Sequence, residues 1–120
     1  MKVAIPAESK SGMASKLFGH FGSSPYYAIY ETEQGTVDFM DNRHEEHEHG
    51  SCQPTAELSA AGVNAIVCGG MGFRAVNRFK ELGIKVYFGD NALTVEDVIY
   101  KWKNQEIKEF QIENACQGHQ

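Results

Sequence analysis

The feature that most constrains the fold of this chain is a short apolar run bounded by glycines, NAIVCGG at residues 64–70. A continuous apolar segment of this length is typical of a strand buried on both faces, as in a parallel sheet. Residues at helical spacing follow directly, and IKVYF at 84–88 then reads as a further strand. The apolar positions of the intervening helix are Phe73, Val76, Phe79 and Leu82, ahead of Gly83. A strand, a helix and a strand in this order predict a crossover connection.

The segments before this unit add further strands and a helix. Residues 2–6 (KVAIP) predict a first strand, and residues 26–31 and 36–41 predict a hairpin. A Gly- and Ser-rich loop lies between them, with a short helical turn expected around residues 13–18. A helix is expected over residues 54–62, because Pro is favoured at a first helical position and Gly just past the last.

The last predicted helix carries the clearest start signal. Thr94 is the expected N-cap, and Asp97 follows three residues later in a capping-box pattern. Its apolar face would consist of Val95, Val98, Ile99 and Trp102. All elements together predict an α/β fold, with a single domain over residues 1–103 and a C-terminal tail at 104–120. We expect a mixed β-sheet of about five strands flanked by helices.

The net charge limits the classes of molecule that the chain is expected to bind. The 120-residue chain holds 11 Lys and Arg against 16 Asp and Glu, a formal charge of -5, which disfavours nucleic acid and anionic lipid as partners. No apolar run approaches the roughly 20 residues of a membrane span, and the first residues lack the apolar stretch of a secretory signal. The odd number of cysteines, 3, favours reduced thiols over a disulfide framework. We therefore expect a cytoplasmic protein.

The strongest chemical signal is the segment HEEHEHGSC, which brings four metal-capable side chains close together in sequence: His44, His47, His49 and Cys52. Imidazole nitrogen and thiolate sulfur suit zinc, copper and iron. A second pair, Cys116 and His119, lies in the tail and would join the site if the tail folds back. The competing interpretations are a solvated acidic loop with incidental histidines and a frayed chain end.

Two further positions favour an anionic ligand. Cys52 precedes the helix expected at residues 54–62, and a helix N-terminus stabilises a thiolate or an anion. A glycine turn also follows the buried strand and allows close backbone approach at the start of the next helix, through Gly69, Gly70 and Gly72. Simple tight packing of strand on helix is the alternative interpretation of this turn. Its loose match to a dinucleotide fingerprint, with Asp90 as the ribose-binding acid, is weak so late in the chain.

His20 and Cys68 are assigned separately. His20 lies in the segment FGHFGSSP and is a candidate ligand or anion donor, with a loop-ordering hydrogen bond as the alternative. Cys68 ends an apolar strand and is expected to be a small core residue. No nucleophile elbow and no paired carboxylates on the first strand are present in the sequence, so we do not expect an enzyme.

Several of these segments resemble a known family. VAIPA, FGHFGSSPYYAIYE, NAIVCGGMG and LGIKVYFG together resemble the dinitrogenase iron-molybdenum cofactor biosynthesis family, the NifX-like proteins, over about residues 2–103. The resemblance implies a small α/β domain with a ribonuclease H-like arrangement that binds a preformed iron-molybdenum or molybdenum-copper sulfur cluster, or a precursor, and passes it on. His20 matches the histidine of the family's loop, and the three glycines match its glycine turn. The family has no ligand motif shared by all members, so the other donors rest on their spacing alone.

The sequence therefore predicts a non-enzymatic carrier or store for an anionic metal-sulfur cluster, with a cluster-donor or cluster-acceptor protein as its partner. A simple zinc or copper module built on the His-rich segment is the alternative. A nucleotide-binding protein or nuclease is the alternative that the residues favour least. The sequence leaves the oligomeric state open.

Overall fold

The structure, a computed structural model, describes residues 1–19, 21–41, 58–89 and 93–109, with only the backbone for Phe73. Its strands are β1 (Lys2–Ala7), β2 (Tyr26–Glu31), β3 (Thr36–Asp41), β4 (Ala65–Cys68), β5 (Lys85–Phe88) and β6 (Lys108–Glu109). Its helices are α2 (Phe73–Glu81) and α3 (Val95–Lys103), with 3-10 turns η1 (Gly12–Ala14) and η2 (Phe21–Ser23). Residues 58–60 are also helical.

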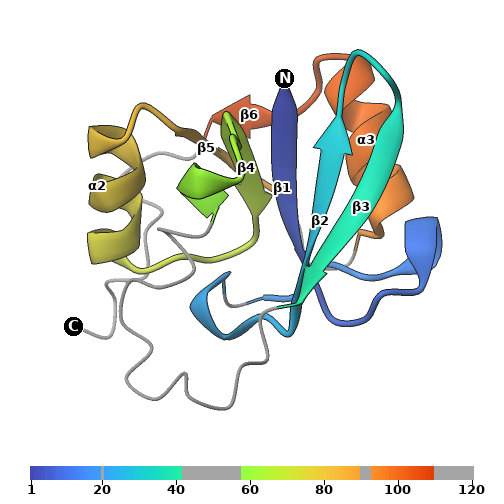
Figure 1. Ribbon diagram of the computed structural model, residues 1–120, viewed down its shortest axis with the longest axis horizontal. Coiled ribbons are helices and arrows are strands. Elements are labelled where there is room, and N and C mark those ends of the chain that lie inside the picture. The colour runs from blue at the N-terminus through green and yellow to red at the C-terminus, as the bar shows by residue number, and fades with distance from the viewer. Residues whose placement is uncertain (20, 42–57, 90–92, 110–120) are drawn as a thin grey trace.

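The strands form one mixed sheet in the order β3-β2-β1-β4-β5-β6 (Figure 1). The hairpin of β2 and β3 is antiparallel, and β2 pairs antiparallel with β1 from Lys2 opposite Glu31 to Ala7 opposite Tyr26. The other neighbour of β1 is β4, which is parallel to both β1 and β5. The crossover predicted around residues 64–88 is confirmed, because β4, α2 and β5 follow one another with the two strands parallel.

The described residues form six strands of the sheet, so the expected number of about five was too low. The additional strand, β6, lies within residues 104–120, the expected C-terminal tail, and it pairs antiparallel with β5. Glu109 lies opposite Tyr87, and Lys108 lies opposite Phe88. Both residues of β6 are charged and exposed, so no alternation of apolar residues marks the strand in the sequence.

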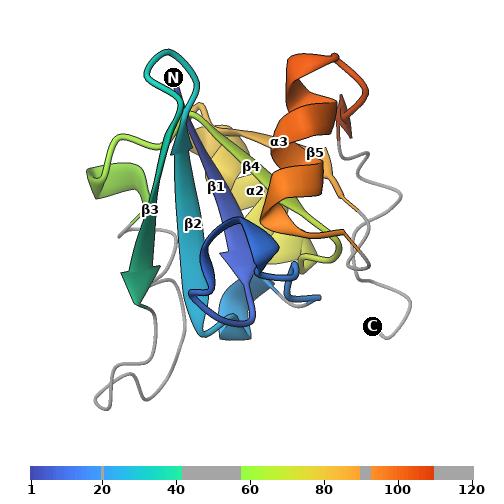
Figure 2. The same ribbon diagram turned by 90° about the vertical axis from the view of Figure 1, so that its right-hand side faces the viewer.

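Side chains on the two faces of the sheet belong to two separate cores, and Figures 1 and 2 together show α2 and α3 on opposite sides of the sheet. Alternation along β1 makes the division, because Ala4 packs in the core under α2 while Val3 and Ile5 pack in the core under α3. The first core also takes in Leu58, from the short helical segment, and Cys68, which is fully buried as predicted. A sheet covered on both faces explains the continuous apolar run of β4.

Local signals account for most of the element boundaries. The capping box of α3 is confirmed, since the Asp97 amide donates to Thr94 Oγ1 at 3.2 Å and the Thr94 amide donates to Asp97 Oδ2 at 3.1 Å. The helical turn expected at 13–18 is instead a 3-10 turn at Gly12–Ala14, and Leu17 forms an isolated bridge with Ala7. Of the helix expected over 54–62, residues 58–60 are helical, and residues 54–57 lie outside the described part. None of the helices in the described ranges has the length and apolar character needed to span a bilayer.

Candidate functional site

The carboxyl ends of the three parallel strands define one edge of the sheet, where β1, β4 and β5 end at Ala7, Cys68 and Phe88. The chain also changes direction there, because β2 and β3 lie on one side of β1 while β4 to β6 lie on the other. Ligands of open α/β sheets bind outside the carboxyl ends of the strands, at such a switch point. We therefore take this edge, called the carboxyl edge below, as the candidate site.

The predicted glycine turn lies at the carboxyl edge, between β4 and α2. Gly69 is half-buried, Gly70 is buried, and Gly72 is exposed at the N-cap of α2. Met71 anchors the turn, since it is only 2% exposed and packs in the core under α2. The turn thus presents glycine backbone to solvent from a fixed support.

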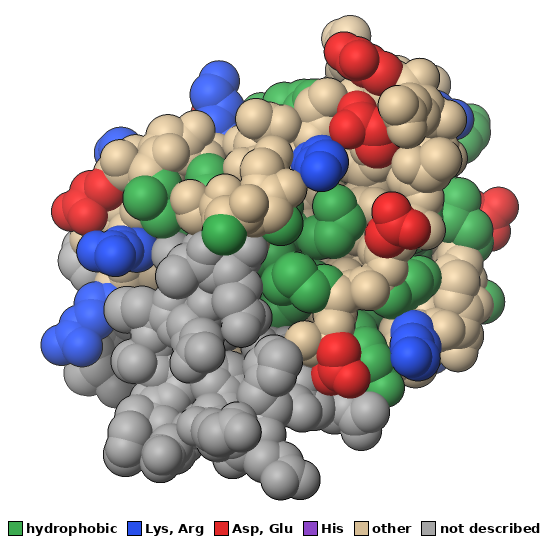
Figure 3. Space-filling model, viewed as in Figure 1, with side chains coloured by type: hydrophobic (Ala, Val, Ile, Leu, Met, Phe, Trp, Pro, Cys, Tyr) green, Lys and Arg blue, Asp and Glu red, His purple; other side chains and the backbone are tan. Residues whose placement is uncertain are grey.

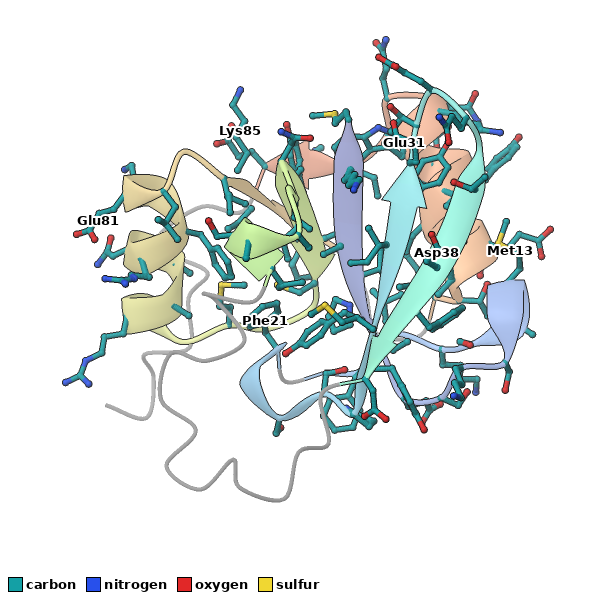
Figure 4. The ribbon with its side chains drawn as sticks, viewed as in Figure 1. Met13, Phe21, Glu31, Asp38, Glu81 and Lys85 are labelled. Atoms are coloured by element: carbon teal, nitrogen blue, oxygen red, sulfur yellow. The ribbon has the colours of Figure 1, made fainter. Side chains whose placement is uncertain are left out.

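A second glycine-rich segment, the one that contains η2, is joined directly to this turn. The Phe21 amide donates to the carbonyl oxygen of Gly70 at 3.2 Å. The ring of Phe21 packs edge-on against Phe79 of α2, with 5.2 Å between ring centroids, and lies 5.1 Å from the ring of Tyr27. The Tyr27 hydroxyl in turn donates to the Phe21 carbonyl oxygen at 2.6 Å. Figure 4 shows Phe21 between the sheet and α2, so η2 and the glycine turn form one rigid corner.

The first turn of α2 keeps its backbone donors available. Gly72 is the N-cap, with φ -69 and ψ 156, and no side chain of the described residues caps the helix. The first turn contains no acidic residue, whereas Arg74 lies within it and is exposed. Uncapped N–H groups and the helix dipole give this end of α2 a partial positive charge of about half a unit. The site can therefore hold an anion next to the glycine turn.

The His-rich segment leaves the sheet at this same carboxyl edge. Asp41, the last residue of β3, lies opposite Tyr26, and Tyr26 lies opposite Ala7 at the carboxyl end of β1. The segment of residues 42–57 begins immediately after Asp41. Gly89 also lies at this edge, because its amide donates to the Cys68 carbonyl oxygen at 2.9 Å.

The tail starts in a different direction. Because β6 is antiparallel to β5, the chain runs from Lys108, opposite Phe88, to Glu109, opposite Tyr87, and so away from the carboxyl edge. The described residues thus bring the glycine turn and the start of the His-rich segment to one edge, but they do not direct the tail there.

The predicted side-chain ligands lie outside the described residues: His20, His44, His47, His49, Cys52, Cys116 and His119. Their role stays a prediction. Within residues 1–19, 21–41, 58–89 and 93–109, no group of three or more His, Cys, Asp or Glu could hold a metal ion. The three glycines are the predicted site residues that the structure does place.

Two residues that shape this corner were not identified from the sequence. Phe21 and Tyr27 hold η2 against the glycine turn through their rings and through the hydroxyl contact. The signal available for Phe21 was its place beside His20 in FGHFG, and Tyr27 was read only as part of a strand. Their contacts join distant segments, which spacing along the chain does not reveal.

The chain is similar to several known proteins. It is 30% identical over 115 residues to an uncharacterized protein of Methanocaldococcus jannaschii, covering 92% of each chain. The solution structure of a Thermotoga protein, provisionally named NifB, superposes with a TM-score of 0.76 at 27% identity over 90% of this chain and 91% of that one. The apo form of the orange protein from Desulfovibrio gigas shares the fold, with a TM-score of 0.81 at 17% identity, over 92% of this chain and 96% of that one.

Residues 1–105 match the model of one protein family, described as Dinitrogenase iron-molybdenum cofactor. The match spans every strand of the sheet except β6 and includes both glycine-rich segments of the carboxyl edge. The chain therefore belongs to the dinitrogenase iron-molybdenum cofactor family.

Proposed function

We propose that this chain binds an anionic metal-sulfur cluster, of the iron-molybdenum or molybdenum-copper type, or a precursor of such a cluster, and stores or delivers it without acting as an enzyme. Membership of a family named for the dinitrogenase iron-molybdenum cofactor supports the class of cargo.

The observation that carries the proposal is the corner formed by η2, the glycine turn and the first turn of α2. Here the Phe21 amide donates to the Gly70 carbonyl oxygen, next to the uncapped helix start at Gly72. Sulfide on a cluster of net negative charge is a hydrogen-bond acceptor, and backbone N–H groups at a helix N-terminus are its natural donors. Glycines let such a bulky guest approach the backbone without meeting a Cβ atom.

Charge around the corner also favours an anionic guest. Arg74 is exposed in the first turn of α2, and Arg78 and Lys80 are exposed in its last turn. Figure 3 shows basic side chains, with an acidic one among them, on the α2 side of the molecule. The whole chain carries a formal charge of -5, so this cluster of cations contrasts with the rest of the molecule. A local positive field raises the encounter rate of an anion with the site.

Side-chain bonds to the metals are assigned to the donors that the sequence predicts: His20, His44, His47, His49, Cys52, Cys116 and His119. The start of the His-rich segment at the carboxyl edge supports the first five, because Phe21 and Asp41 both lie there. Cargo would pass to or from a cytoplasmic cluster-donor or cluster-acceptor protein by ligand exchange, which loop ligands suit. The strand order β3-β2-β1-β4-β5 is compatible with the ribonuclease H-like arrangement implied by the family resemblance.

An anaerobic titration tests this function. The protein is mixed with tetrathiomolybdate, with and without copper(I) or iron(II), passed over a desalting column, and analysed for colour and bound molybdenum. We expect retained charge-transfer absorbance and a defined stoichiometry. Wild type that retains no molybdenum under any of these conditions would contradict the proposal.

Two variants, each with several substitutions, test which side chains bind the metals. One replaces His44, His47, His49 and Cys52, and the other replaces Cys116 and His119, which tests separately whether the tail contributes ligands. The first variant should lose most of the bound molybdenum. Equal retention by the first variant and the wild type would remove the His-rich segment from the site.

The rival function is a single zinc or copper ion held by the His-rich segment, which the run of donors at residues 44–52 favours. The same titration separates the two functions. One colourless zinc per chain without bound molybdenum supports the rival, and bound sulfide with intense colour supports the cluster.

A further inference from the structure

We infer that a cavity at the C-terminal end of α3 binds a planar aromatic carboxylate. The cavity has a volume of about 480 Å³, and its lining includes Tyr30, Thr32, Tyr87, Trp102, Lys103 and Gln105. This volume is within the range of roughly 300–1,000 Å³ typical of small-molecule sites. A ligand of one or two fused rings fits it with room for its carboxylate.

The site is separate from the carboxyl edge. Tyr30 lies opposite Val3, near the amino end of β1, whereas the glycine turns follow the carboxyl ends of the strands. The inference therefore does not depend on cluster binding, and its failure would leave the proposed function untouched.

Aromatic side chains determine the shape of the ligand. Tyr87 and Trp102 meet edge to face, with 4.9 Å between ring centroids and an interplanar angle of 78°. Both rings are only half-buried, so part of their surface faces the cavity together with Ile107. Rings of this kind favour stacked or edge-on contact with another flat ring over contact with a branched aliphatic group.

The buried hydroxyl group of Tyr30 is a hydrogen-bond donor for a ligand in the cavity. Tyr30 is 2% exposed and lines the cavity, yet no group in the described part of the chain forms a hydrogen bond with its hydroxyl. Buried tyrosine hydroxyls nearly always have a partner, because a buried donor without an acceptor loses the hydrogen bond that it makes with water in the unfolded chain. A ligand oxygen in the cavity supplies the partner that the described residues lack.

The positive charge of Lys103 favours an acceptor group that carries a negative charge. Lys103 lines the cavity and forms no ion pair with any described residue, whereas its neighbour Lys101 pairs with Glu106 at 3.7 Å. Thr32 adds a second hydroxyl to the lining. A hydroxyl donor, a second hydroxyl and an ammonium group beside flat apolar walls match a carboxylate attached to an aromatic ring.

Titration with 2-naphthoate tests the inference, because Trp102 is the single tryptophan and its indole N–H gives one resolved signal in a nitrogen-proton NMR spectrum. We expect that signal to shift saturably, with a Kd below about 1 mM. Cyclohexanecarboxylate, an anion without a flat ring, and 2-naphthamide, a flat ring without charge, should each bind at least about fivefold more weakly.

Variants assign the polar contacts. Tyr30→Phe should weaken 2-naphthoate binding about fivefold, the effect of one hydrogen bond, and Lys103→Gln should weaken it about threefold or more at low salt. The matched controls are Tyr100→Phe and Lys101→Gln, both on α3, which should bind as the wild type does; Tyr100 is 66% exposed and neither residue lines the cavity.

Three results would overturn the inference. The first is an unchanged Trp102 signal up to about 5 mM 2-naphthoate, which would mean that the cavity holds solvent only. The second is unaltered affinity in both Tyr30→Phe and Lys103→Gln. The third is equal binding of cyclohexanecarboxylate.

Discussion

Replacing Gly72 by Asp should stabilise the protein and weaken cluster binding at the same time. Gly72 is the N-cap of α2 with ordinary extended backbone angles, φ -69 and ψ 156, and a Cβ atom added there meets nothing within 4 Å. An aspartate is therefore accommodated without strain, and its carboxylate can accept from the free N–H groups of the first turn. It would also occupy the position that we assign to the anionic guest.

The substitution should raise the free energy of unfolding and lower the affinity for the anionic guest. Capping contributes a few tenths of a kcal/mol relative to Gly, and the charge at the positive end of the dipole adds about 0.3–1 kcal/mol, so the melting temperature should rise by about 2–5 °C. For binding, a unit charge about 6 Å from a dianionic guest is repelled by about 1.4–2.8 kcal/mol at effective dielectric constants of roughly 80 to 40. That repulsion corresponds to affinity weakened about 10- to 100-fold.

Gly72→Asn is the matched control, because asparagine caps a helix as well as aspartate but carries no charge. Thermal unfolding of the apo protein and anaerobic titration with the thiomolybdate-copper cluster measure the two effects. The asparagine variant should gain stability and keep most of its affinity. Equal affinity of the aspartate and asparagine variants would refute the assignment of the guest to the start of α2.

Three further predictions concern the scaffold and its response to pH. Gly89→Ala should destabilise the protein by about 1–3 kcal/mol in denaturant unfolding, since its Cβ would come within 2.7 Å of the buried Val67 side chain. Tyr27→Phe should cost about 1–2 kcal/mol, because the Phe21 carbonyl oxygen loses its buried donor. The hydrogen bond from the N-terminal ammonium lowers the pKa of Glu31 below its ordinary value of 4.5, so the folded state binds this proton less readily than the unfolded state. The stability that this pair contributes should be present above pH 4.5 and lost as the pH falls through the pKa of Glu31 in the folded state. In thermal unfolding, the melting temperature of Glu31→Gln should therefore fall less steeply with acidification than that of the wild type.

The two stability predictions each have a control within the same chain. Gly22→Ala should be nearly neutral, because a Cβ atom there meets nothing within 4 Å, and a loss as large as that of Gly89→Ala would contradict the packing argument. Tyr100→Phe removes an exposed hydroxyl and should change stability little. If the melting temperature of Glu31→Gln falls with acidification as steeply as that of the wild type, other carboxylates govern acid unfolding.

Much of the fold could be predicted because local patterns and burial agreed. The capping box of Thr94 and the apolar run of β4 each report on residues near in sequence, and both are confirmed. The sixth strand could not be predicted, since Lys108 and Glu109 pair through their backbone with β5 and show no apolar pattern. Strand pairing of two residues depends on the neighbour that tertiary structure provides.

The glycine turn of the candidate site could be predicted from the sequence, but the segment that packs against it could not. Gly69, Gly70 and Gly72 were identified from the turn between strand and helix, and the structure places them at the carboxyl edge. The hydrogen bond that joins Phe21 to this turn links residues far apart in the chain, which periodicity does not encode. Sequence spacing therefore identified the glycines of the turn but not the segment that they contact, and the assignment of the His and Cys donors stays a prediction.

Amide NMR of the loaded protein tests the central claim most directly. The thiomolybdate-copper cluster is added anaerobically to nitrogen-labelled protein, and shifts of the backbone amides are mapped along the chain. Residues 21–23 of η2 and residues 69–74 at the start of α2 should show the largest shifts, with α3 and β6 unchanged. Large shifts confined to other parts of the sheet, with η2 and the start of α2 unaffected, would contradict the account.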